Sequence, residues 1–165
     1  MNRITVKIAG PAGTGIKSAG LLLAKIVTDC GYYFADYMEY PSLVRGGHNT
    51  YQITYSTQEV FMVDKTADIL ISLVKGHEED GVNLWSIPLS NDIFANTMAI
   101  GALVYRLDLD KEIAKKIIKE RFGDDGKNPE AFEEGYIWGE KNTLTPPRAS
   151  SQCRPYRRSC CRCSL

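Results

Sequence analysis

The chain has 165 residues, 44% of them hydrophobic, and a formal net charge of zero. This length is enough for one domain with a single core, which buries roughly 70% of the surface of the unfolded chain. The sequence contains no apolar run near the ~20 residues that span a bilayer, and its first residues have a strand pattern instead of a signal-sequence pattern. We therefore expect a cytoplasmic protein that does not contact a membrane.

The zero net charge conceals two parts of opposite sign. Residues 148–165 hold five arginines and no acid, so residues 1–147 carry 15 basic and 20 acidic side chains, a net charge of −5. Beyond residue 142 the sequence also loses both helical and strand periodicity. We therefore expect a domain over residues 1–142 and an irregular, basic, cysteine-rich tail over residues 143–165, which a truncation or a shifted reading frame would explain.

The cysteines do not predict a metal site. Four of the five lie in the tail, without the paired C-x-x-C spacing of zinc or iron–sulfur sites. Cys30 alone lies in the domain, where we expect a reduced core residue. The tail arginines have Tyr156 as their one aromatic neighbour, so nucleic-acid binding is not expected either.

The first elements surround a glycine-rich turn. Residues 4–9 are rich in β-branched side chains and predict a central strand, and residues 16–30 have the apolar stripe of a helix that Gly31 ends. Between them, three glycines in six residues allow a sharp bend and close approach of a ligand or a neighbouring chain. Backbone N–H groups at the start of the helix would then face a space that suits an anion.

Two known phosphate motifs do not fit this turn. A P-loop has Lys directly after its last glycine, whereas here Ile16 separates Gly15 from Lys17. The dinucleotide pattern has a third glycine where this chain has Ser18. A phosphate site and a tight turn that binds nothing therefore both remain open.

The remaining elements follow in order. Residues 32–37 predict a second strand, joined to the first by a right-handed parallel crossover. A polar loop leads to a half-exposed strand over residues 48–55, which a hairpin turn would join to residues 59–63. Later segments are a buried strand at 67–74, a short strand at 85–89, and helices at 92–107, 110–123 and 128–139, the second capped by Asp110 and the third by Asn128 before Pro129.

Two stretches together carry a family resemblance. Gly13-Thr14-Gly15-Ile16-Lys17-Ser18-Ala19-Gly20 is followed by a segment from Glu39 to Gln52 that contains Arg45-Gly46-Gly47-His48. With Ala95 to Leu103 and Asn128 to Tyr136, these stretches resemble the gamma domain of the 2-oxoacid:ferredoxin oxidoreductases over roughly residues 3–141. In this family the gamma domain is either a separate subunit or the N-terminal part of a fused alpha subunit. The segment of this chain from Tyr40 to His48 is more similar to the fused, 2-oxoglutarate-type version, in which the alpha domain would begin near residue 143.

This resemblance implies a three-layer α/β/α Rossmann-like domain with a mixed, mostly parallel sheet. It also implies an accessory role in oxidative decarboxylation of a 2-oxoacid to an acyl-CoA, with electrons passed to ferredoxin. In that family, thiamine diphosphate and the iron–sulfur clusters lie on other domains or on alpha and beta subunits, so the chain alone should be inert and bind no cofactor by itself. The chain departs from the family between Val74 and Asn96, where a longer segment with another strand and helix is usual.

The candidate binding residues lie on two segments. Gly13, Thr14 and Gly15 could offer backbone N–H groups to a phosphate, with charge added by Lys17. Arg45, on a loop with Gly46 and Gly47, could clamp a carboxylate or phosphate, or form an ion pair with Glu39 or a partner subunit. Ser42 could line a coenzyme A channel or stabilise a turn, and His48 could transfer a proton or bond a backbone carbonyl.

Two other functions remain open beside the accessory domain. The glycine turn could belong to a free-standing nucleotide- or phosphate-binding module, which would bind ATP or a dinucleotide alone. The chain could also be an inactive fragment. The 2-oxoacid is selected mainly outside the gamma domain in this family, so the substrate and the subunit stoichiometry do not follow from this sequence.

Overall fold

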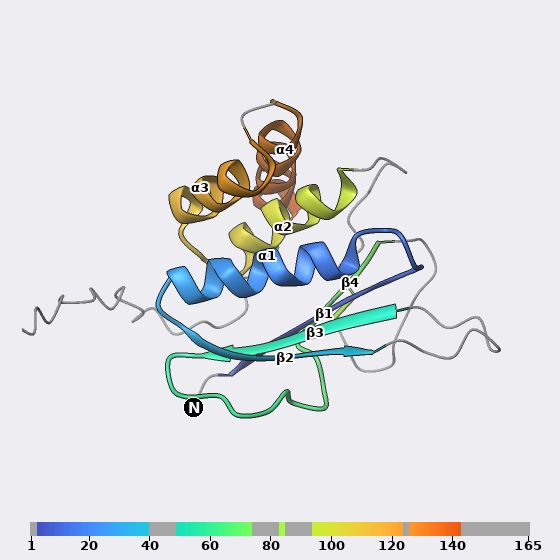
Figure 1. The fold of residues 1–165 in the computed structure, drawn as a ribbon, viewed down its shortest axis with the longest axis vertical. Helices are drawn as coiled ribbons and strands as arrows, with labels where there is room; N and C mark the ends of the chain where they lie inside the picture. The colour runs from blue at the N-terminus through green and yellow to red at the C-terminus, as the bar shows by residue number, and fades with distance from the viewer. Residues whose placement is uncertain (1–2, 40–48, 74–82, 85–93, 124–125, 143–165) are drawn as a thin grey trace, which may run out of the picture.

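The computed structural model describes residues 3–39, 49–73, 83–84, 94–123 and 126–142. Within these residues, a five-stranded sheet has the order β2-β3-β1-β4-β5 and four helices lie on one of its faces (Figure 1). The strands are β1 (Ile4–Gly10), β2 (Tyr33–Glu39), β3 (Asn49–Ser56), β4 (Ile69–Ser72) and β5 (Asn83–Leu84), and the helices are α1 (Ile16–Asp29), α2 (Ala95–Arg106), α3 (Lys111–Phe122) and α4 (Lys127–Asn142). The class predicted from the sequence, an α/β domain, is confirmed.

The sheet is mixed, and four of its strands run in the same direction. β1 pairs in parallel with β4, and β4 with β5, whereas β3 is antiparallel to both β1 and β2. The central position of β1 is confirmed. β2 has the direction predicted for the crossover from β1, but β3 is inserted between the two strands, so β1 and β2 do not pair.

The helix layer shares one apolar core with the sheet. Alternate residues of the strands, such as Val6 and Ile8 of β1 and Ile53 of β3, point toward the helices and are fully buried. They pack with Leu23 of α1 and Ile100 of α2 in a single cluster. Of the three layers expected, the described residues therefore form the sheet and one helical layer.

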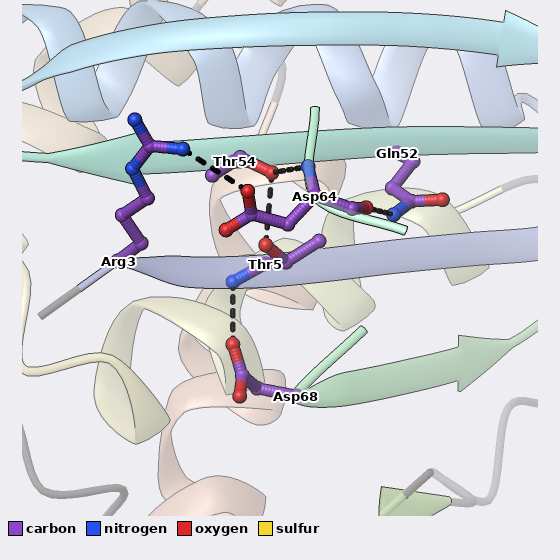
Figure 2. A network of polar contacts seen from close by, with 6 residues as sticks. All are labelled: Arg3, Thr5, Gln52, Thr54, Asp64 and Asp68. Carbon is purple, nitrogen blue, oxygen red and sulfur yellow. Dashed lines mark hydrogen bonds and ion pairs between the residues drawn. The ribbon is translucent and has the colours of Figure 1, made fainter. Parts of the chain in front are cut away.

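The opposite face of the sheet is polar and is crossed by the connection between β3 and β4. Figure 2 shows Asp64 of this connection beside Thr5 of β1 and Thr54 of β3, whose hydroxyl groups are 2.8 Å apart. The Asp64 N–H donates to Thr54 Oγ1 at 2.9 Å, and Gln52 Nε2 donates to the Asp64 carbonyl at 2.5 Å. The connection is thus fixed to the sheet through hydrogen bonds.

The structure corrects three local expectations. Residues 59–63 form no strand, and the next residue, Asp64, bonds to side chains of β3 and not to its backbone. β3 is almost wholly buried instead of half-exposed, since α1 covers one of its faces and residues 57–68 cover part of the other. Asn128 lies inside α4, where it accepts a hydrogen bond from the Thr97 hydroxyl at 2.9 Å, so it does not cap the helix.

The boundaries marked by Asp110, Gly123 and Gly31 are as predicted, whereas α4 ends at Asn142 and not at residue 139. The Asp110 carboxylate accepts the N–H groups of Glu112 and Ile113, and Gly123 ends α3 with a φ of 79°. Gly31, with a φ of 90°, follows the end of α1. The expected strand at 85–89 and the tail at 143–165 lie outside the described residues. Within the described ranges, every helix is too short or too polar to cross a bilayer.

Candidate functional site at the glycine-turn edge

The glycine turn lies at the edge of the sheet where the parallel strands end. β1 ends at Gly10 and the adjacent parallel strand β4 ends at Ser72, after which the Leu73 N–H donates to the Ala9 carbonyl at 2.8 Å. In open α/β sheets, ligands bind outside the carboxyl ends of the strands. A ligand site is therefore expected at this edge of the sheet.

The ends of the segment 40–48 meet the same edge. Gly10 at the end of β1 pairs with Asn49 at the start of β3, and Glu39 at the end of β2 pairs with Thr50. The two residues that flank the segment are thus one and two strands away from the glycine turn. The predicted site residues Ser42, Arg45, Gly46, Gly47 and His48 themselves lie outside the described residues.

The turn contains two residues in the left-handed region of backbone space. Gly13 has a φ of 89° and Gly15 a φ of 79°, which explains why both positions are glycine. The Thr14 hydroxyl donates to the Pro11 carbonyl at 2.8 Å, so this side chain stabilises the turn. Gly13 is exposed, and a Cβ there would meet nothing within 4 Å, so its backbone is open to approach from outside.

The helix that follows begins without a side-chain cap. Gly15 occupies the N-cap position of α1, and the first turn contains no acidic residue. The Ala19 N–H donates to the Gly15 carbonyl at 2.9 Å, which leaves the N–H groups of residues 16–18 without a partner inside the helix. Lys17 is exposed in this turn and adds a positive charge to the positive end of the helix dipole.

A second helix starts at this edge. α2 also begins without a side-chain cap or an acidic residue in its first turn. Its second residue, Asn96, lies directly against Gly15, because a Cβ built on Gly15 would be 2.7 Å from Asn96 Nδ2. The sequence did not mark Asn96 as a site residue, although it lies near the start of a predicted helix within the family resemblance.

The predicted residues of the turn are therefore together, and their chemistry is that of binding. Gly13, Thr14, Gly15 and Lys17 form one surface with one cation. The Thr14 N–H, expected to be free for a ligand, donates to the Pro11 carbonyl at 3.4 Å, whereas the N–H groups of residues 16–18 have no partner inside the helix. The described residues include no group of three His, Cys, Asp or Glu side chains that could hold a metal ion, and no histidine. The N–H groups and the cation of this surface are of the kind that binds and orients an anion.

The described part of the chain also has a groove of about 770 Å³ at the other end of α1. Residues of α1, β2 and α3 line it, among them Asp29, Tyr33 and Lys116. It lies beyond the carboxyl end of α1, on the side of the molecule away from the glycine turn. It is therefore separate from the candidate site.

Residues 5–84 match the family described as Pyruvate ferredoxin/flavodoxin oxidoreductase. The 2-oxoglutarate synthase subunit KorC of Archaeoglobus fulgidus is 27% identical across 93% of this chain and 96% of that subunit. The 2-oxoacid:ferredoxin oxidoreductase subunit alpha of a Sulfolobus species is 36% identical over 70 residues, which are 42% of this chain and 11% of that subunit. The match thus spans about a tenth of the Sulfolobus subunit and nearly all of KorC.

The alignment with KorC is longer than this chain, 185 positions against 165 residues. KorC therefore has residues that this chain lacks.

Solved structures share the fold. The 2-oxoglutarate:ferredoxin oxidoreductase from Magnetococcus marinus, solved with 2-oxoglutarate, coenzyme A and succinyl-CoA bound, matches 89% of this chain and 32% of its own chain with a TM-score of 0.74 at 22% identity. The gamma subunit of a keto/oxoacid ferredoxin oxidoreductase from Geobacter sulfurreducens matches 84% of this chain and 99% of its own, with a TM-score of 0.65 at 20% identity. Residues 5–84 thus match the model of the pyruvate ferredoxin/flavodoxin oxidoreductase family, and the resemblance found in the sequence is confirmed.

Proposed function

We propose that this chain is the gamma-type component of a cytoplasmic 2-oxoacid:ferredoxin oxidoreductase. In this role it helps to form the site for coenzyme A and the 2-oxoacid, while alpha and beta subunits hold thiamine diphosphate and the iron–sulfur clusters and pass electrons to ferredoxin. The observation that carries the proposal is the match with KorC, which extends over 96% of a protein named as one subunit of 2-oxoglutarate synthase. In this role the chain is one component of an enzyme and is inert alone.

The glycine turn is proposed to receive a phosphate of coenzyme A. Its backbone is accessible at Gly13, the first N–H groups of α1 lack helical partners, and Lys17 is exposed beside them. Phosphates bind well at such helix starts, because the N–H groups and the helix dipole both favour negative charge. The related Magnetococcus enzyme was solved with coenzyme A bound, which supports this class of ligand.

The segment 40–48 is proposed to supply the second part of the site. Its flanking residues, Glu39 and Asn49, end at the same edge as the glycine turn. Arg45 would bind the carboxylate of the 2-oxoacid or a further phosphate in bidentate fashion, and Ser42, Gly46 and Gly47 would line the approach. Thiamine diphosphate, bound by the partner subunits, supplies the carbanion chemistry, and this chain orients coenzyme A and the 2-oxoacid.

The test is an assay of the assembled enzyme. The chain is co-expressed with partner subunits, and 2-oxoacid oxidation that depends on coenzyme A is measured with an artificial electron acceptor. We expect Lys17→Ala to raise the KM for coenzyme A about 5- to 10-fold, since one charged contact contributes about 1–1.4 kcal/mol. Lys25→Ala is the control, because Lys25 lies on the same helix and pairs with Asp29 at 3.1 Å.

Two results would contradict the proposal. An unchanged KM in Lys17→Ala would remove the turn from the coenzyme A site, and unchanged turnover in Arg45→Ala would remove Arg45. Tight binding of ATP or a dinucleotide by the isolated chain would favour the free-standing phosphate-binding module instead.

A further inference from the structure

The contact between Gly15 and Asn96 joins two helix starts that lie far apart in the sequence. A Cβ built on Gly15 would lie 2.7 Å from Asn96 Nδ2, 3.3 Å from its Cγ and 3.4 Å from its Cβ. The Asn96 side chain thus occupies the space that a side chain at position 15 would need. Gly15 is glycine for two reasons, its positive φ and this contact.

The orientation of the Asn96 amide follows from its hydrogen bond. Asn96 Oδ1 accepts the Thr97 N–H at 2.8 Å, and only the oxygen of an amide can accept. Nδ2 must therefore lie on the other side, where it faces Gly15. Within the described ranges, Nδ2 donates no hydrogen bond.

The neighbouring residue anchors this amide to the helix layer. Thr97 is fully buried, and its hydroxyl donates to Asn128 Oδ1 at 2.9 Å. Asn128 belongs to the first turn of α4 and is 9% exposed. The start of α2 is therefore fixed by α4, and through Asn96 it touches the turn that precedes α1.

We propose that Asn96 is a positioning residue for the glycine turn. Its amide holds Gly15 in place, so that the first N–H groups of α1 face the ligand edge in one conformation. The identity of the ligand, a phosphate of coenzyme A, comes from the proposed function, and only this part of the inference rests on the proposed function. Preorganised donors bind more tightly, because they lose less conformational freedom when the ligand arrives.

Removal of this side chain should leave α2 intact. The N–H groups of Thr97 and Met98 both donate to the Phe94 carbonyl at 3.0 Å, and these bonds do not involve the Asn96 side chain. Asn96→Ala is therefore expected to fold. This makes the positioning role separable from a general loss of structure.

The first test compares two glycines in two backgrounds. Gly13 and Gly15 both have positive φ, but only the Cβ of Gly15 would meet Asn96. We expect Gly15→Ala to lower Tm by about 5 °C more than Gly13→Ala, and this excess to fall to about 2 °C or less when Asn96 is also alanine. If Gly15→Ala still lowers Tm by about 5 °C more than Gly13→Ala in the Asn96→Ala background, the contact with Asn96 does not restrict position 15 and the inference fails.

The second test measures amide hydrogen exchange in the full chain. The Ala19 N–H closes the first turn of α1 by donating to Gly15 at 2.9 Å, and the Ala114 N–H closes the first turn of α3 by donating to Asp110 at 3.1 Å. Asn96→Ala should speed exchange at Ala19 about 10-fold and leave Ala114 unchanged. An equal change at both amides, or none at Ala19, would overturn the positioning role even if Gly15→Ala fails to fold.

The assembled enzyme separates this inference from the proposed function. Asn96→Ala should raise the KM for coenzyme A about 5-fold while kcat stays within about 2-fold, because the turn binds and does not react. If Lys17→Ala raises this KM and Asn96→Ala does not, the inference fails and the proposed function stands. If neither variant changes it, the turn is not part of the coenzyme A site, and both fail.

Discussion

The two faces of the sheet are held by different forces. On the helix face, fully buried residues such as Val6, Ile8 and Ile53 pack under α1 and α2. On the other face, Thr5 and Thr54 are buried just as deeply, but they bond through hydroxyl groups to each other and to the connection between β3 and β4 (Figure 2). Neighbouring residues of one strand, such as Thr5 and Val6, thus stabilise the fold in two ways, by hydrogen bonds on one face and by apolar packing on the other.

The difference shows where stability is concentrated. A buried aliphatic side chain contributes about 1.5–3 kcal/mol, whereas a hydrogen bond contributes about 1 kcal/mol net. The connection on the polar face buries Val60 but exposes Phe61 by 83% and Met62 by 68%, so little apolar burial holds it. We therefore expect substitutions on the helix face to have the larger effects.

The largest effect is expected between α2 and α4. Gly135 of α4 faces the backbone of α2 so closely that a Cβ would overlap the Met98 carbonyl. Gly135→Ala would force the two helices apart and should lower the free energy of unfolding by about 3 kcal/mol or more, measured by denaturant titration. Glu134→Ala, at the exposed neighbouring position, should change it by less than about 0.5 kcal/mol. Similar values for the two variants would contradict this close packing.

The next largest effect on stability is expected at the contact between α1 and β3. A Cβ on Gly20 would overlap the Tyr51 ring, which is buried beneath the helix. Replacing glycine by alanine inside a helix normally stabilises the helix by about 1 kcal/mol. At Gly20 we expect the overpacking against the Tyr51 ring to outweigh this gain, so that Gly20→Ala lowers the free energy of unfolding by about 2 kcal/mol. Lys25→Ala on the exposed side of α1 is the control. A stabilised Gly20→Ala protein would show that the ring can move aside.

On the polar face the same measurements should give smaller losses. Thr54→Val keeps the shape of the side chain but leaves the Asp64 N–H and the Thr5 hydroxyl without their shared partner. We expect Thr54→Val to lower the free energy of unfolding by about 1–2 kcal/mol. A Thr5→Val/Thr54→Val double variant should lower it by less than the sum of the two single variants. Thr57→Val, at an exposed position of the connection, serves as the control. Additive losses would mean that the two hydroxyl groups act independently.

The Tyr51 hydroxyl adds a dependence on pH to the helix face. Burial raises its pKa, and the hydrogen bond to Asp36 and the charge of that carboxylate raise it further. An unfolded tyrosine loses its proton near pH 10 while the folded one keeps it, so stability should fall as pH rises above about 10. At pH 11 the wild type should have lost about 1 kcal/mol more than Tyr51→Phe, each relative to its own value at pH 8. Tyr37→Phe, 60% exposed, should behave like the wild type.

Local signals predicted most of this fold. Asp110, Gly123 and Gly31 lie at helix ends as expected, because capping depends on residues within one turn. The central position of β1 also followed from its apolar pattern. The hairpin at 59–63 was wrong: the next residue, Asp64, bonds to side chains of β3 and not to its backbone. The cap at Asn128 was wrong, since its side chain bonds to Thr97 of α2, which is distant in the sequence.

The candidate site was predictable only in part, for the same reason. Positive φ at Gly13 and Gly15 agrees with the bend expected from the glycines. The role of Asn96 depends on how α2 packs beside α1, which no local pattern contains. The roles of Arg45 and His48 remain predictions, because their segment lies outside the described residues.

The smallest effect is expected at the exposed border of the polar face. Arg3 pairs with Asp64 at 3.1 Å, but their side chains are 35% and 37% exposed, so water and salt weaken the attraction. Arg3→Ala should lower the free energy of unfolding by less than about 0.5 kcal/mol, and this loss should vanish in 1 M NaCl. Asp64 bonds to Thr54 and Gln52 through its backbone, which Asp64→Ala retains, so that variant should behave like Arg3→Ala. A loss above about 1 kcal/mol in Asp64→Ala alone would mean that the carboxylate, and not the backbone, fixes the connection to the sheet.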